Sequence, residues 1–204
     1  CKSFIFLKIV LVGYILTRIF MPMIKQKKLL DSSDINRKII RISHEIIEKN
    51  TNIDNIFLVG ILSRGEPLAM RIRSSIKKIT NKDVLFGSLD ITFHRDDFRE
   101  RLLVPQVKGT SIDDDITDKV LILIDDVLYT GRTIRAAMDE LNSFGRPSKI
   151  QLAVLVDRGH REVPIRADYV GVNIPTHEGE HVKVELKEID ELDSVSLFNY
   201  KGQK

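Results

Sequence analysis

The sequence predicts an α/β domain built on a central, mainly parallel β-sheet flanked by helices. Short apolar runs bounded by turn residues alternate with segments of helical periodicity, which is the order typical of strands joined by crossover helices. The apolar run 120–124 is continuous, as in a central strand buried on both faces. The 204 residues are 43% hydrophobic and 30% charged, a balance typical of a globular domain.

The N-terminal half of this domain begins with a predicted helix at 34–49. Its apolar stripe consists of isoleucines at spacings of four, three and four: Ile35, Ile39, Ile42 and Ile46. Ser33 or Asp34 is expected to cap the N-terminus of this helix. Three further elements follow, each bounded by turn residues: a strand at 56–61, a helix at 67–79 and a strand at 84–93.

The C-terminal half begins with a long connector at 94–118, which is rich in charges and turn formers. Connectors of this length in a compact domain are often mobile lids over a functional site. Five elements are predicted after it: a strand at 120–124, a helix at 133–144, and strands at 150–156, 169–172 and 182–186. With no internal repeat and no linker in view, residues 23–204 are expected to form a single domain.

Residues 1–22 are expected to lie outside this domain. They are apolar but carry Lys8 and Arg18, and the uninterrupted stretch 9–16 is shorter than the ~20 residues that span a bilayer. A small-residue cleavage site is missing, which argues against a secretory signal. We interpret the segment as an upstream extension or fragment end that is not part of the native fold; a membrane anchor is the alternative.

Composition excludes several classes of protein. The single cysteine, Cys1, allows no internal disulfide and fits a reducing, cytoplasmic compartment. The five histidines form no metal-ligand pattern, and a zinc site needs three or four convergent ligands. The net charge of +3 is mildly basic, which permits a nucleic acid or phosphate-rich partner without requiring one.

The most informative segment, 121–133, reads Leu-Ile-Leu-Ile-Asp-Asp-Val-Leu-Tyr-Thr-Gly-Arg-Thr. An apolar strand ends in Asp125 and Asp126, and a loop with Thr130 and Gly131 leads into a helix. Ligands of open α/β sheets bind beyond the carboxyl ends of strands, and a helix N-terminus favours a phosphate. Carboxylates accept hydrogen bonds from ribose hydroxyls, so the segment predicts a sugar-phosphate site. An ordinary polar turn would leave two costly carboxylates unexplained, and the P-loop spacing is absent.

The same segment resembles the phosphoribosyl-diphosphate (PRPP) motif of type I phosphoribosyltransferases. Three other segments, 43–48, 90–97 and 156–175, are similar to the family of pyrimidine operon regulatory proteins, and the resemblance covers about residues 29–190. It implies the type I phosphoribosyltransferase fold, with a mobile lid and a small hood. It also implies an enzyme that couples uracil to PRPP, giving UMP and diphosphate, with Mg²⁺ on the diphosphate and no direct protein ligand to a metal.

The resemblance also assigns roles to residues. Asp125 and Asp126 would hold the ribose hydroxyls, and together with Arg64 and Arg95 they form the expected catalytic set. The 5′-phosphate would lie against a run of seven residues: Val127, Leu128, Tyr129, Thr130, Gly131, Arg132 and Thr133. The diphosphate loop would comprise Ser63, Arg64 and Gly65, with Arg95 at the diphosphate end or in the lid, and Arg158 and Val182 would lie near the base.

A second activity implied by the resemblance is binding of pyrimidine-operon leader mRNA in response to UMP or UTP, which promotes transcription attenuation. Basic surfaces attract phosphate backbones, and the expected contacts are Arg37, Arg41, His44, Lys49, His160, Arg161 and Arg166. The sequence departs from the family pattern at Ile40, Lys49 and Val172, which weakens this surface. A cytoplasmic homodimer or higher oligomer with no membrane partner is also implied.

Three other functions stay open on the sequence alone. The first is a uracil phosphoribosyltransferase that has lost RNA regulation. The second is a nucleotide sensor that keeps the PRPP motif without turnover. The third and most distant is a purine phosphoribosyltransferase.

Overall fold

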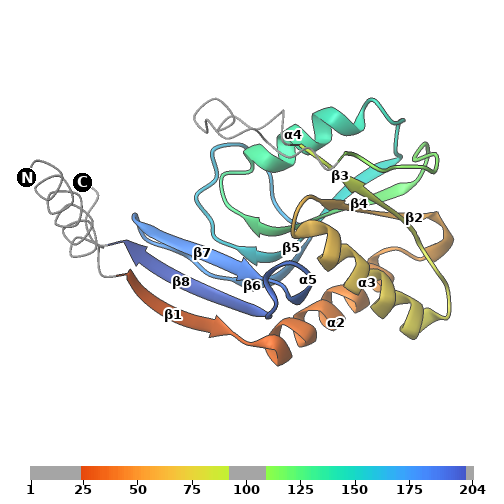
Figure 1. Ribbon diagram of the computed structural model, residues 1–204. Coiled ribbons are helices and arrows are strands. Elements are labelled where there is room, and N and C mark those ends of the chain that lie inside the picture. Colours follow the sequence, from red (N-terminus) through yellow and green to blue (C-terminus); the bar gives the residue numbers. More distant parts are fainter. Residues whose placement is uncertain (1–23, 92–108, 201–204) are drawn as a thin grey trace, which may run out of the picture.

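The computed structural model describes residues 24–91 and 109–200 of the chain. Two sheets organise these residues (Figure 1). The larger one is fully parallel, in the order β3-β2-β4-β5-β6. Its strands are β3 (Leu85–Leu89), β2 (Ile56–Ile61), β4 (Val120–Leu128), β5 (Lys149–Asp157) and β6 (Tyr169–Asn173). The predicted α/β class with a parallel sheet is therefore confirmed.

Helices cover both faces of this sheet (Figure 1). Helices α2 (Ser32–Lys49) and α3 (Gly65–Thr80) pack on one face, against Leu58 and Ile122 among others. Helix α4 (Arg132–Leu141) packs on the other face, where Leu121 and Leu123 point. Alternate residues of β4 thus enter two separate cores, which explains why its sequence is apolar without interruption.

Helix α2 begins two residues earlier than predicted, and its cap is Asp31 rather than Ser33 or Asp34. The Asp31 side chain accepts a hydrogen bond from the Asp34 N–H at 2.9 Å, and the Asp34 carboxylate accepts one from the Asp31 N–H at 3.2 Å. Asp34 therefore occupies the third helical position of a capping box. The four isoleucines of the predicted stripe are all buried, at 3% exposure or less.

Strand β4 is longer than predicted and contains both acidic residues. It continues to Leu128 because its backbone stays paired with β5, with Asp125 opposite Val154 and Leu128 opposite Asp157. Helix α4, in contrast, ends at Leu141 rather than at residue 144. The strand predicted at 56–61 is confirmed residue for residue.

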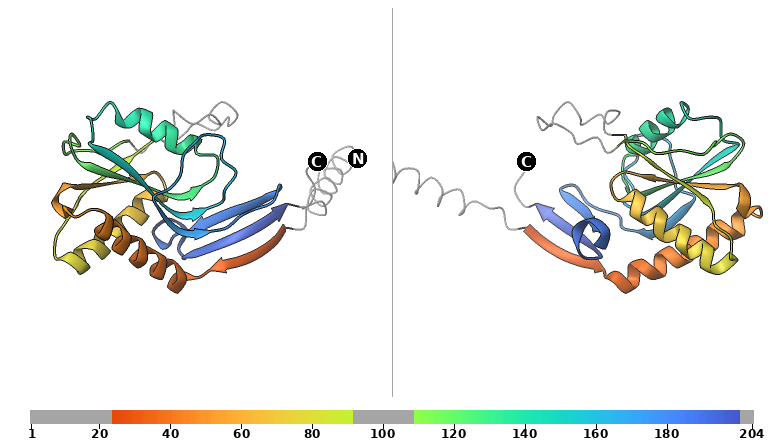
Figure 2. Two further views of the ribbon diagram at one scale, coloured as in Figure 1. Left: turned by 180° about the vertical axis from the view of Figure 1, so that it is seen from behind. Right: turned by 45° about the vertical axis from the view of Figure 1, so that its right-hand side comes forward.

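The second sheet forms a hood at one end of the domain (Figure 2). Its antiparallel strands run β1-β8-β7, with β1 (Ile24–Leu30), β8 (Ser194–Tyr200) and β7 (Glu180–Glu185). Short helix α5 (Lys187–Asp190) links β7 to β8. The sequence analysis predicted β7 but missed β1, β8 and α5. Strands β1 and β8 lie near opposite ends of the chain and pair with each other. Nothing in the local sequence of either strand therefore indicates the pairing.

Some predictions lie outside the described residues. These are the assignment of residues 1–22 and most of the predicted lid at 94–118, since residues 92–108 are not described. The strand predicted at 84–93 is shorter than expected: β3 ends at Leu89, and Asp90 and Ile91 lie outside it. Within residues 24–91 and 109–200, no helix has both the length and the apolar composition needed to cross a bilayer.

Candidate active site

A cavity of about 660 Å³ opens at the carboxyl edge of the parallel sheet, within the size range of small-molecule sites. Segments 61–64 and 125–134 line it, together with Val182 of the hood. Strands β2 and β4 are neighbours in the sheet, so the loops that follow them meet at this edge. Of the residues predicted to bind PRPP, the described ones all line the cavity except Gly65 and Arg158, and Arg95 lies outside the described residues.

The loop after β4 has its carbonyl groups turned away from the cavity toward segment 158–163. The Leu128 carbonyl accepts the Arg158 N–H at 2.9 Å, and the Tyr129 carbonyl accepts Arg161 Nη1 at 2.7 Å. The Thr130 carbonyl accepts the N–H groups of Glu162 and Val163, at 3.0 and 3.3 Å. With three successive carbonyls held on one side, the peptide N–H groups that follow them point to the other side, an arrangement that would suit an anion.

Helix α4 starts directly at this loop and adds its N-terminus to the cavity. Gly131 is its N-cap residue, in the left-handed conformation with φ of 91°, which only glycine adopts at little cost. The first N–H groups of a helix lack intrahelical partners, and together with the positive end of the helix dipole they favour a phosphate. Thr130 and Thr133 add hydroxyl donors beside them.

Asp125 and Asp126 form the floor of the cavity. The Asp126 N–H donates to Asp125 Oδ1, and the Val127 N–H donates to Asp126 Oδ1, both at 2.9 Å. Burial raises the pKa of Asp126, while hydrogen bonding and the nearby Arg64 guanidinium act in the opposite direction. A carboxylate has several lone pairs and can accept more than one hydrogen bond, which makes the pair suitable acceptors for neighbouring sugar hydroxyls.

The loop after β2 is pressed onto the end of β4. A Cβ atom on Gly65 would lie 2.3 Å from the carbonyl oxygen of Ile124, so only glycine allows this approach. The contact sets Ser63 and Arg64 beside the two carboxylates. The Arg64 guanidinium binds Asp190 of α5, through Nη2 at 2.7 Å and Nε at 3.1 Å.

Arg158 lies behind Tyr129 and outside the cavity lining. It is only 8% exposed and lies over the Tyr129 ring, 4.1 Å from the ring centroid. Its Nη2 donates to the Glu180 carbonyl at 2.6 Å and to Thr176 Oγ1 at 3.2 Å. Burial lowers the pKa of Arg158. The predicted base-side residues Arg158 and Val182 are thus brought to one side of the cavity, although Arg158 reaches it only through Tyr129.

The residues predicted to bind RNA separate into two places. On α2, Arg41 donates to the carbonyls of Val170 and Gly171 at 2.6 and 2.8 Å, and also pairs with Glu45. Lys49 lies 2.6 Å from the Asp168 carboxylate and over the Tyr169 ring. His44 and Arg37 are exposed on the same helix. Arg166 is exposed two residues before Asp168, so α2 and segment 166–171 bring these basic residues to one surface, called the basic surface below, which also carries Asp168 and Glu45.

His160 and Arg161 lie instead beside the cavity. The His160 ring makes an edge contact with Tyr129, with centroids 5.8 Å apart, and its Nε2 lies 2.6 Å from the Thr176 carbonyl. Arg161 uses its guanidinium to bind the carbonyls of Tyr129, Gly159 and Ile165 and the Asp157 carboxylate. Arg161 thus ties its own segment to the loop that follows β4.

Sequence reasoning missed the partners that hold these residues in place. Asp190, Thr176 and Asp157 bind Arg64, Arg158 and Arg161 respectively. Asp190 lies 126 positions from its partner, and nothing in its local sequence signals the pairing. The adjacent apolar residues Ile61 and Leu62 also line the cavity and were read only as the end of a strand and the start of a loop.

Comparison with known proteins identifies the family. Residues 25–189 match the model of the phosphoribosyl transferase domain. The chain is 53% identical over 175 residues to the bifunctional protein PyrR of Clostridioides difficile, covering 86% of this chain and 99% of that one. It is 57% identical over 178 residues to the PyrR of Alkaliphilus metalliredigens, covering 87% and 98%.

A solved structure adds evidence on the fold alone. A hypoxanthine-guanine phosphoribosyltransferase from Bacillus anthracis superposes with a TM-score of 0.62 at 20% identity, covering 84% of this chain and 98% of that one. The predicted type I phosphoribosyltransferase fold is confirmed by this likeness and by the matched domain. Because identity to the PyrR proteins exceeds 50% over most of the chain, the chain belongs to the PyrR family of phosphoribosyltransferases.

Proposed function

We propose that this protein converts uracil and PRPP into UMP and diphosphate, and that it binds pyrimidine-operon leader mRNA when UMP or UTP occupies the same cavity. The observation that carries the proposal is the cavity itself, where two adjacent carboxylates lie between a phosphate loop at a helix N-terminus and an arginine-bearing loop. The bifunctional PyrR relatives support both activities. The hypoxanthine-guanine enzyme shares only the fold, which gives no support to a purine substrate.

PRPP fits the cavity in one orientation. Its 5′-phosphate lies on the loop and helix N-terminus at 128–133, where donors face an anion. The ribose hydroxyls bind Asp125 and Asp126, and the diphosphate lies against segment 63–65 and Arg64. Uracil then enters from the side of Val182 and Tyr129, which brings its nitrogen to the anomeric carbon of the ribose.

Catalysis in this arrangement rests on charge and position. As diphosphate leaves the anomeric carbon, positive charge develops on the ribose ring, and Asp125 and Asp126 stabilise it from beneath. Arg64 stabilises the negative charge that develops on diphosphate. Holding uracil and PRPP together in one cavity provides much of the rate increase over the reaction in solution. Closing the cavity keeps water from hydrolysing PRPP. Arg95 and the predicted lid at 94–118 are proposed to provide that closure.

Mg²⁺ is proposed to accompany PRPP. Among the described residues, no three His, Cys, Asp or Glu side chains come together as a metal cluster. The ion would instead be held by the oxygen atoms of PRPP and by water, the ligands that Mg²⁺ commonly keeps, with no direct protein ligand. When bound, it neutralises charge on the diphosphate oxygens.

The RNA site is proposed on the basic surface of α2 and segment 166–171. Arg37, Arg41, His44, Lys49 and Arg166 are all exposed there. His160 and Arg161 are proposed to respond to the nucleotide as well as to RNA, since both contact the Tyr129 segment of the phosphate loop. A nucleotide in the cavity thereby has a direct route to part of the RNA site.

One observation favours the alternative, a transferase without RNA regulation. Arg41 and Lys49 already have partners within the chain, at the Val170 carbonyl and the Asp168 carboxylate. An RNA phosphate would have to compete with these contacts.

Two assays test the proposal. Labelled uracil, PRPP and Mg²⁺ should yield UMP, whereas hypoxanthine should yield no nucleotide; the absence of product from uracil would refute the enzymatic half. Binding to a leader-RNA hairpin should tighten with UMP or UTP at constant salt. An RNA affinity that changes with salt but not with UMP or UTP would refute the regulatory half.

The protein is also expected to form a homodimer or higher oligomer, which light scattering would test.

A further inference from the structure

The hood contributes a carboxylate to the proposed diphosphate site. Asp190, at the end of α5, accepts two hydrogen bonds from Arg64, at 2.7 and 3.1 Å. Its Oδ2 also accepts the Leu186 N–H at 3.0 Å, which fixes the carboxylate on the hood. The Asp190 and Arg64 side chains are 17% and 30% exposed, so the pair is partly shielded from water.

Arg64 stands between this carboxylate and the floor of the cavity. It lines the cavity, and its charge acts on the pKa of Asp126 as well as on that of Asp190. A guanidinium has five N–H donors, and Asp190 occupies two of them. Among residues 24–91 and 109–200 the other three donors bond to no further acceptor, and their directions are set because the guanidinium is planar and rigid.

We propose that Asp190 is a positioning residue for the diphosphate site, holding the Arg64 guanidinium in the orientation that receives the leaving group. The inference rests on the proposed function, because it takes the group opposite Arg64 to be a diphosphate. The hood would then take part in PRPP binding through Asp190, in addition to lining the cavity with Val182. An arginine that is already oriented loses less conformational entropy when a ligand binds, and the ligand is bound more tightly as a result.

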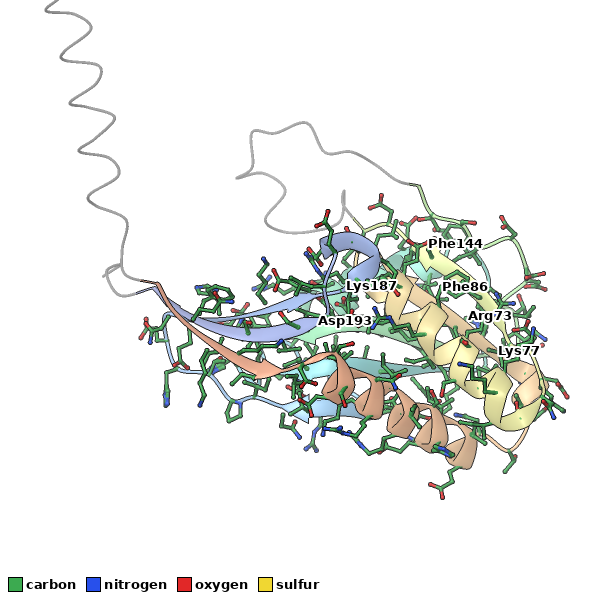
Figure 3. The ribbon with its side chains drawn as sticks, turned by 60° about the horizontal axis from the view of Figure 1, so that its bottom comes forward. Arg73, Lys77, Phe86, Phe144, Lys187 and Asp193 are labelled. Carbon is green, nitrogen blue, oxygen red and sulfur yellow. The ribbon has the colours of Figure 1, made fainter. Side chains whose placement is uncertain are left out.

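A second ion pair between the hood and α3 provides a matched control. Asp193 accepts two hydrogen bonds from Arg71, at 2.7 and 3.0 Å, and one from the Lys187 N–H at 2.8 Å. The geometry is close to that of Asp190, but Arg71 does not line the cavity. Figure 3 shows Asp193 where the hood meets α3. A residue that merely docks the hood should behave like Asp193.

The experiment is calorimetric titration of PRPP, inorganic diphosphate and UMP, each with Mg²⁺, into wild type and variants. Asp190→Asn should bind PRPP and diphosphate about tenfold more weakly, equivalent to ~1.4 kcal/mol. UMP has no diphosphate, so its affinity should stay within about twofold. Asp193→Asn should leave all three affinities within about twofold. In an Arg64→Ala background, Asp190→Asn should have no further effect on diphosphate.

Three results would overturn the inference. Unchanged or tighter diphosphate binding by Asp190→Asn would mean that Asp190 does not assist Arg64, or competes with the ligand for it. An equal loss for UMP, or for Asp193→Asn, would mean general loosening of the hood. A loss that persists without Arg64 would mean that Asp190 acts by another route.

Two further measurements keep the outcomes interpretable. If Asp190→Asn fails to fold by circular dichroism, Asp190→Glu keeps the charge but displaces it by one methylene group, and it should also weaken diphosphate binding. Turnover of uracil by wild type is measured in parallel. If wild type makes no UMP but Asp190→Asn selectively loses diphosphate affinity, the proposed enzyme is refuted and the positioning role of Asp190 stands. If wild type turns over uracil normally but Asp190→Asn keeps its diphosphate affinity, the positioning role is refuted and the proposed enzyme stands.

Discussion

Replacing Gly65 with alanine should push segment 63–65 away from the end of β4, which carries Asp125 and Asp126. These two segments form opposite parts of the proposed active site. In Gly65→Ala the new Cβ would lie 2.3 Å from the Ile124 carbonyl oxygen and 3.4 Å from the Asp125 Cα. Carbon–oxygen contacts in proteins are usually ~3.3 Å or longer. Since the nearest atom belongs to the backbone of a central strand, segment 63–65 has to move by about 1 Å, away from the carboxylates.

The size of the effect follows from this clash. Overpacking of a tight contact costs ~1–3 kcal/mol, and in a chain of this length each kcal/mol lowers the melting temperature by about 2–4 °C. Misplacing a catalytic group by ~1 Å can cost about 100-fold in rate. Gly65→Ala should therefore melt ~2–12 °C lower and lose about 100-fold in kcat/KM for PRPP.

Gly171→Ala is the matched control for this measurement. Its Cβ would lie 2.4 Å from the Leu155 carbonyl oxygen, a clash of the same kind between β5 and β6 and outside the cavity lining. Both variants should lose stability in thermal unfolding, but only Gly65→Ala should lose PRPP turnover. Normal turnover by Gly65→Ala, or equal losses by both variants, would refute the claim that close approach of segment 63–65 to β4 builds the site.

Three further predictions concern the carboxylates, the RNA surface and the hood. Asp126→Asn should abolish most uracil turnover, because it removes a charge beneath the ribose, while RNA affinity in a filter-binding assay stays unchanged. Equal loss of both would contradict the separation of the two sites. Lys49→Gln should weaken leader-RNA binding and reduce the salt dependence by about one counterion, whereas Lys82→Gln, which like its partner Asp54 lies outside α2 and segment 166–171, should not. Arg71 lowers the pKa of Glu188, and Arg64 lowers that of Asp190. A depressed carboxylate pKa adds stability that is full above the unfolded value and is lost as pH falls through the folded value. The unfolding free energy should thus drop below about pH 4, and Glu188→Gln should make that drop shallower in urea titrations; an unchanged slope would count against the pair.

The sequence was a good guide wherever the signal was local. The isoleucine stripe of α2 and the apolar runs of β2 and β4 are visible in windows of a few residues, because their periodicity reflects which face is buried. The segment 121–133 predicted the site for the same reason: strand, carboxylates, loop and helix N-terminus are contiguous. Its boundaries were less well predicted, since backbone pairing with β5 carries β4 past Asp125 and Asp126.

Contacts between distant segments could not be predicted in the same way. The hood sheet depends on β1 pairing with β8, and neither strand carries a turn or a periodicity that names its partner. Similarly, the basic residues of segment 158–166 are separated in the structure: Arg158 is buried against Tyr129, while Arg166 is exposed beside the α2 surface. The presence of an arginine in the sequence does not indicate whether its side chain faces solvent, a carbonyl group or an aromatic ring.

By itself, the sequence determined the fold class and the family, and it singled out the two carboxylates that are proposed to bind the sugar. Each of these is encoded in short stretches whose physical meaning does not depend on the rest of the chain. Only the tertiary structure decided how the arginines are used. It pairs Arg64 with Asp190, Arg158 with the Tyr129 ring, and Arg161 with the Tyr129 carbonyl of the loop after β4. An arginine's role depends on which acceptors folding brings within hydrogen-bond distance, and these acceptors come from other parts of the chain.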